Sequence, residues 1–119
     1  MLIVDAANVI GSRPDGWWRD RAGATRRFAQ QVQATVDGGV LQPPVALVIE
    51  GRARDGVAES VANGVQIVHA HGEGDDTIVA LAQSASAVVV TADRELARRV
   101  RSVGAEVVGP RWLLDRLVE

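Results

Sequence analysis

Short apolar runs alternate along the chain with stretches in which apolar residues recur every three or four positions. A continuous apolar run bounded by turn residues is typical of a parallel strand buried on both faces, whereas helical spacing predicts a helix. Strands are predicted at residues 2–5, 45–49, 65–68, 87–90 and 105–108. Helices are predicted at residues 17–36, 57–63, 75–85, 94–103 and from 110 onward, with a loop at 9–16. This alternation predicts an α/β fold, a three-layer α/β/α sandwich around a parallel sheet of about five strands.

The composition narrows the class of protein. The 119 residues are 47% hydrophobic, which suits one folded domain over residues 1–119. No apolar run approaches the roughly 20 residues of a membrane span, and no charged and apolar leader precedes the first strand, so we expect a cytoplasmic protein. The absence of cysteine excludes disulfides, thiolate nucleophiles and thiolate metal sites.

The charges limit the mechanism and the partners. All 13 basic residues are arginines, so reactions that need a lysine, such as Schiff-base chemistry or a Walker phosphate loop, are excluded. Because the formal net charge is -2, the chain does not hold nucleic acid through overall basicity. A polyanion would instead meet a local arginine patch or be delivered by a partner.

Acidic residues follow several of the predicted strands. Asp5 ends the first strand, Glu50 follows the second, and Asp93 stands three residues after the fourth, while Asp75 and Asp76 open a helix that also follows a strand. Parallel strands bring their carboxyl ends to one edge of the sheet, so we expect these side chains to converge. Clustered carboxylates repel one another, and a hard cation such as Mg²⁺ or Mn²⁺ relieves the repulsion. Such a centre suits hydrolysis of a nucleic-acid phosphodiester.

Three of these acids also have a purely structural interpretation. Asp5 or Asn8 would suit a helix cap or an Asx-turn at the end of the first strand. Asp75 and Asp76 would suit the cap and the first turn of a helix, where the helix dipole favours negative charge. A cap explains one of these two aspartates well and does not exclude a second role.

Two further features of the sequence could belong to a ligand-binding site. His69 and His71 alternate along one face of a strand, a spacing that a metal could use, although no third nitrogen or sulfur ligand stands nearby. Gly72 and Gly74 lie between a strand and a helix, as in a dinucleotide-binding loop. A third glycine is missing, and the two aspartates that follow would repel a pyrophosphate.

Three motifs together resemble the PIN-like ribonuclease superfamily, specifically its NYN branch and the YacP-like group. They are Asp5-Ala-Ala-Asn8 after a buried strand, Asp75-Asp76-Thr-Ile78 at a helix start, and Val90-Thr-Ala-Asp93-Arg-Glu-Leu96. The similarity spans residues 2–108. It implies a sheet in the order 3-2-1-4-5 with the first strand central, and cleavage of single-stranded RNA with one or two Mg²⁺ or Mn²⁺ ions.

The resemblance also implies roles for the acids. Asp5, Asp76 and Asp93 match the metal-binding residues of the family. Asp75, the neighbour of the matching helix acid, and Glu50 would serve as secondary ligands or position water. Glu50 stands where many members of the family have an aspartate.

Other residues are expected to position or bind the RNA. Asn8 and Thr91 would orient the carboxylates or the scissile phosphate through hydrogen bonds. The candidates for contact with phosphates are Arg52, Arg54 and Arg94. The paired Trp17 and Trp18 could stack unpaired bases beside Arg19 and Arg21. Burial in the core is the alternative for one tryptophan, and a solvated loop for the arginines. No membrane contact is expected, while presentation of RNA by a ribosome or another partner and the oligomeric state stay open.

Several other functions compete with a ribonuclease. A PIN-like module that binds RNA or assembles a complex without cutting it would keep the same fold, and a toxin-type ribonuclease would share the chemistry but need a neutralising partner. A phospho-acceptor domain similar to receiver domains would rely on a lysine that this chain lacks. A haloacid-type phosphatase would need a second aspartate where Ala7 stands.

Overall fold

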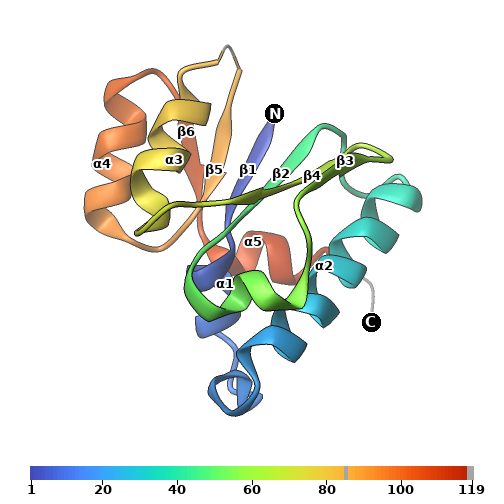
Figure 1. The fold of residues 1–119 in the computed structure, drawn as a ribbon. Helices are drawn as coiled ribbons and strands as arrows, with labels where there is room; N and C mark the ends of the chain where they lie inside the picture. Colours follow the sequence, from blue (N-terminus) through green and yellow to red (C-terminus); the bar gives the residue numbers. More distant parts are fainter. Residues whose placement is uncertain (85, 118–119) are drawn as a thin grey trace.

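The computed structural model describes residues 1–84 and 86–117 and arranges them as a six-stranded sheet between two layers of helices (Figure 1). This is the α/β/α sandwich that the alternation of strands and helices predicts. Ala85, which belongs to a predicted helix, lies outside the described residues. Within the described ranges, no helix is both long and apolar enough to cross a lipid bilayer.

The strands lie in the order β3-β4-β2-β1-β5-β6, with β1 near the middle of the sheet. Their bounds are Leu2–Asp5 (β1), Val45–Ile49 (β2), Ser60–Ala62 (β3), Val65–His69 (β4), Val88–Val90 (β5) and Glu106–Val108 (β6). All neighbours pair in parallel except β3 and β4, which are antiparallel. Apart from β3, the observed order is the predicted 3-2-1-4-5, which is confirmed. The carboxyl ends of β1, β2 and β5 therefore meet at one edge of the sheet.

Helices cover both faces of the sheet. Their bounds are Ala6–Gly11 (α1), Trp17–Arg19 (η1, a 3₁₀ helix), Arg21–Asp37 (α2), Gly51–Gly56 (η2, also 3₁₀), Gly74–Ala82 (α3), Arg94–Ser102 (α4) and Pro110–Leu114 (α5). Helices α1, α2 and α5 pack on one face, and α3 and α4 pack on the other (Figure 1).

Strand β1 is fixed by burial on both faces, because its side chains alternate between the two cores. Val4 packs with Phe28 of α2 in one core, and Ile3 packs with Leu96 of α4 in the other. All four side chains have no exposed surface, at 0% each. Full burial of such a side chain contributes about 1.5–3 kcal/mol. The strand that ends at Asp5 is therefore held firmly in place.

The helix predicted at residues 57–63 is wrong. Residues Ser60–Ala62 instead form β3, an exposed edge strand that pairs with β4 and places Ala62 opposite Val65. Asn63 and Gly64, with φ of 53° and 82°, form the turn between the two strands. An Asn-Gly pair favours such a two-residue hairpin because both positions take a positive φ. This dipeptide was the local signal for a hairpin.

The predicted boundaries before α2 also need correction. The loop predicted at 9–16 begins inside α1, and the helix predicted at 17–36 is divided at Asp20. The Asp20 side chain caps α2 by accepting a hydrogen bond from the Gly23 N–H at 2.9 Å. A Cβ on Gly23 would lie 2.2 Å from an Asp20 carboxylate oxygen, so glycine lets the cap close. The cap leaves Trp17 in the separate turn η1, where its ring lies near Gly11 of α1.

Gly56, at the end of η2, lies where a side chain would collide with α2. A Cβ at this position would be 2.1 Å from the carbonyl oxygen of Ala22. We therefore expect Gly56→Ala to lower the free energy of unfolding by about 1–3 kcal/mol, because backbone must move to admit the methyl group. Denaturant unfolding measures this change. In the control Gly11→Ala the new methyl would meet Trp17 only at an ordinary 3.7 Å. Equal stability of the two variants would contradict the packing of η2 on α2.

Candidate active site

The carboxyl edge of the sheet gathers acids from separate parts of the chain. Asp5 is the last residue of β1, Glu50 directly follows β2, and Asp93 occupies the N-cap position of α4. Asp75 lies in the first turn of α3 and interacts electrostatically with all three. These four residues are termed the acidic cluster below.

Asp5 is the half-buried member of the acidic cluster on the central strand. Burial raises the pKa of its carboxyl group from 3.8 to about 6, against the opposing effect of hydrogen bonds from Thr91 and the backbone of Asn8. Repulsion by Asp75 and Glu50 contributes to the same upward shift. No arginine or histidine of the described residues forms an ion pair with Asp5. The ionised Asp5 side chain therefore lacks a positive partner within the described protein.

Thr91 and Asn8 tie the loop after β5 to β1 and α1. The Thr91 hydroxyl donates to Asp5 Oδ2 at 2.9 Å and accepts from the Asp93 N–H at 3.1 Å. Asn8 Oδ1 accepts from the Ala92 N–H at 2.8 Å. Because Thr91 is only 3% exposed, its hydroxyl links two acids and does not reach a ligand at the surface. This placement suits the orienting role predicted for Thr91 better than direct contact with RNA.

Asp93 and Glu50 each use one carboxylate oxygen to satisfy the start of a helix. Asp93 Oδ1 accepts from the Leu96 N–H at 3.0 Å in α4. Glu50 Oε2 accepts from the Gly74 N–H at the start of α3, where Glu73 makes no side-chain cap. The other oxygen of each carboxylate makes no hydrogen bond to a described residue. Each of these two carboxylates therefore satisfies a helix start with one oxygen and leaves the second for a ligand.

The two aspartates at the start of α3 point in different directions. The Asp76 side chain is 90% exposed, and its Oδ1 accepts a hydrogen bond from Arg99 at 2.8 Å. Asp75 is half-buried, and its pKa is raised by burial first and then by repulsion from neighbouring acids, Asp93 foremost. The structure thus brings Asp75, rather than Asp76, to the acidic cluster. The spacing held a signal for this: Asp75 lies three residues before the buried Ile78, on the face packed against the sheet.

The arginines predicted to bind RNA lie in different environments. Arg54 donates hydrogen bonds to two backbone carbonyls, at 3.1 and 3.4 Å, so its guanidinium is used within the protein. The Arg19 guanidinium lies over the Trp18 ring, 5.8 Å from the ring centre. Arg52 and Arg94 are exposed and form no hydrogen bond or ion pair with the described residues. Arg52 and Arg94 are thus the better placed of the four for contact with a phosphate.

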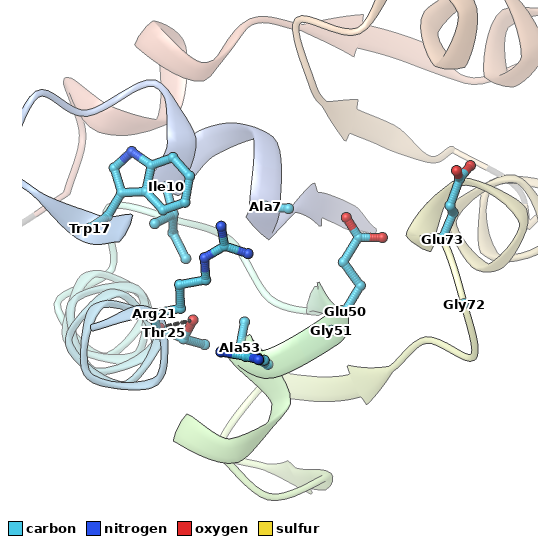
Figure 2. Close-up of a pocket in the computed structure, with 11 residues that line it drawn as sticks. Ala7, Ile10, Trp17, Arg21, Thr25, Glu50, Gly51, Ala53, Gly72 and Glu73 are labelled. Carbon is cyan, nitrogen blue, oxygen red and sulfur yellow. Dashed lines mark hydrogen bonds between the residues drawn. The ribbon is translucent and has the colours of Figure 1, made fainter. Parts of the chain in front are cut away.

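A cavity of about 350 Å³ lies beside the acidic cluster (Figure 2). Trp17 and Arg21 lie on one side of it, with the guanidinium 5.5 Å from the ring centre, and Glu50 lies on the other. Glu73 and Arg52 complete its charged lining. Glu73 is absent from the predicted site, although it directly precedes the first turn of α3.

The acids suit a hard cation in their chemistry, but they do not form a closed set of ligands. They offer only oxygen atoms, and burial and repulsion raise the pKa of Asp5 and Asp75. Within the described ranges, however, no three histidine or acidic side chains are placed so that they could hold a metal ion. The Nε2 of His69 is used within the protein, because it lies 2.7 Å from the Val57 carbonyl oxygen. His71 is exposed.

The fold and the acidic edge define an α/β-sandwich protein with a site at the carboxyl ends of its central strands. A family model described as a PIN-like domain matches residues 25–112. The chain belongs to the PIN-like domain family, whose members are generally nucleases. Its structure is also similar to the crystal structure of Rae1 (YacP) from Bacillus subtilis, with a TM-score of 0.69 and 20% identity over 96% of this chain and 71% of that chain. No curated protein matches the sequence. The predicted membership of the PIN-like superfamily is confirmed. The similarity to the YacP protein is one of fold.

Proposed function

We propose that this chain is a metal-dependent endoribonuclease that hydrolyses phosphodiester bonds of single-stranded RNA at the acidic cluster. The observation that carries the proposal is Asp5, a half-buried carboxylate that is repelled by Asp75 and Glu50 and has no cationic partner among the described residues. An asparagine could accept the hydrogen bond from Thr91 without the cost of a buried charge. A charge retained at such a cost favours a role in chemistry.

The residues proposed to hold Mg²⁺ or Mn²⁺ are Asp5, Asp75 and Asp93. Asp75 takes the place that the resemblance gave to Asp76, because Arg99 holds Asp76 outside the acidic cluster. A bound cation would neutralise charge on a phosphate oxygen and lower the pKa of a bound water.

Other residues of the site would position these ligands. Thr91 and Asn8 fix the loop that carries Asp93 against β1 and α1. Glu50 anchors the first N–H of α3 and so sets the position of Asp75. We propose Arg52 and Arg94, which follow Glu50 and Asp93 closely in the chain, as contacts for the flanking RNA phosphates.

Cleavage of an end-labelled single-stranded RNA tests the proposal. We expect cutting with Mn²⁺ or Mg²⁺ and none in excess chelator. Asp93→Asn should lower the rate by about 100-fold. It should keep α4 intact, because asparagine caps a helix as well as aspartate does. Asp115→Asn, an exposed acid after α5, should cut like the parent. An undiminished rate for Asp93→Asn in matched metal would contradict the assignment.

The second candidate is an RNA-binding module without catalytic activity. The lack of a closed ligand set among the described acids is the observation that favours it. The same assay separates the two functions when binding is measured beside cleavage. RNA binding of equal strength in Mn²⁺ and in chelator, without cutting by the parent, would overturn the nuclease in favour of the module.

A further inference from the structure

The cavity beside the acidic cluster has a lining of mixed character. Its walls come from α1, η1, α2, η2 and the loop before α3, so elements distant in sequence enclose it. Ile10 and Ala53 supply apolar surface, and Trp17 supplies a ring (Figure 2). At about 350 Å³ the cavity is at the small end of ligand pockets, which span roughly 300–1,000 Å³. It suits a single small group and not an extended segment.

The polar groups of the cavity favour a flat, hydrogen-bonding ligand. The Arg21 guanidinium lies against the Trp17 ring, 5.5 Å from its centre, which gives one wall two planar groups. Neither Arg21 nor Arg52 forms an ion pair with a described acid. Across the cavity, the carboxylates of Glu50 and Glu73 can only accept hydrogen bonds when ionised (Figure 2). A planar group with donors on its edge matches all of these features.

The cavity also adjoins the site of proposed chemistry. Glu50 lines the cavity and repels Asp5 and Asp75 of the acidic cluster, so the two regions share a wall. A polymer held with a phosphate at the cluster would therefore bring its next group to the mouth of the cavity.

We propose that this cavity binds one unpaired nucleobase of the RNA, next to the phosphate at the acidic cluster, by stacking it on Trp17 and Arg21. The inference rests on the proposed function, because the acidic cluster supplies the reason for RNA to lie there. It assigns the single-strand preference to a physical cause: a base must leave its partner before it can enter. Base stacking on aromatic and guanidinium groups tolerates every base, so we expect little sequence preference from this contact alone.

Binding of short RNAs that lack bases tests the inference without relying on cleavage. Affinities of a labelled tetraribonucleotide and of its abasic counterpart are measured by fluorescence anisotropy, with Ca²⁺ in place of Mn²⁺ and with both RNAs checked intact. The parent should bind the RNA with bases about tenfold more tightly than the abasic RNA. Trp17→Ala should remove that difference and leave the affinity for the abasic RNA unchanged.

A second variant covers the case in which loss of Trp17 disturbs the fold. Ala53→Leu would fill part of the cavity from η2 and should also remove the difference, with melting temperature as the check on folding. Trp18→Ala, which alters a 55% exposed indole outside the cavity lining, should keep it. The inference is overturned if the parent does not distinguish the two RNAs, or if both cavity variants still do. Failure to cleave RNA, with the binding difference intact, would overturn the proposed function and leave the cavity assignment standing.

Discussion

Replacement of Asp5 by asparagine should stabilise the metal-free protein and lower RNA cleavage by at least about 1,000-fold. The stability gain follows from the raised pKa of Asp5, which is about 6 in the folded protein and 3.8 in the unfolded chain. Ionisation of Asp5 therefore costs nothing below pH 3.8, a growing amount up to about pH 6, and a constant amount above. At pH 7 we expect Asp5→Asn to raise the free energy of unfolding by about 1–3 kcal/mol.

Thermal unfolding in chelator across pH 4 to 8 measures the effect. The two proteins should melt together near pH 4, and the variant should melt several degrees higher at pH 7. Added Mn²⁺ should raise the melting temperature of the parent and not that of Asp5→Asn. Asp37→Asn, an exposed acid at the end of α2, is the matched control and should show neither change. A destabilised Asp5→Asn at pH 7 in chelator would contradict an unpaired, costly carboxylate at this position.

Opposite effects on stability and activity are informative because they separate structural acids from functional ones. An acid retained as a cap loses both stability and function when it is neutralised. An acid retained for a cation destabilises the metal-free protein, and only the bound cation compensates for this cost. Within the acidic cluster, we expect Asp5 to show the second behaviour most clearly, since its hydrogen bond from Thr91 would survive the change to asparagine.

Much of the fold followed from local patterns, and the meeting of the acids followed from topology. Apolar runs located the parallel strands, and parallel strands bring Asp5, Glu50 and the loop of Asp93 to one edge. The sheet order came from the resemblance, because no local pattern states which strands are neighbours. The hairpin at β3 was missed since its three exposed residues carry no apolar period. The cavity was missed because five elements enclose it.

The orientation of α3 shows where motif matching ends. The resemblance aligned Asp76 with a metal-binding acid, while the structure turns Asp75 inward. Two contacts across the fold accompany this rotation: Glu50 accepts from the Gly74 N–H, and Arg99 of α4 pairs with Asp76. Both partners lie more than 20 residues away in the chain, so the motif itself does not contain them.

The neighbouring pair at the start of α3 gives the strongest comparison between two variants. Asp75→Asn should lower RNA cleavage by at least about 1,000-fold, because it removes a half-buried ligand candidate, whereas Asp76→Asn should stay within about threefold of the parent. Both changes remove one negative charge from the first turn of the same helix, so their effects on the helix dipole are matched. Because the Asp76 side chain is exposed, its ion pair with Arg99 contributes about 1 kcal/mol or less to stability. A difference in activity between the two variants would therefore not come from unfolding of Asp76→Asn.

Initial rates at several Mn²⁺ concentrations make this comparison decisive. If Asp75 holds the cation, Asp75→Asn should stay inactive or recover only at much higher Mn²⁺, and Asp76→Asn should keep the metal dependence of the parent. The reverse result, with Asp76→Asn inactive and Asp75→Asn active, would mean that α3 turns when the cation binds and that Arg99 releases Asp76 to the site. An Arg99→Ala variant would then cut faster than the parent at low Mn²⁺, whereas with Asp75 as the ligand it should cut at the parental rate.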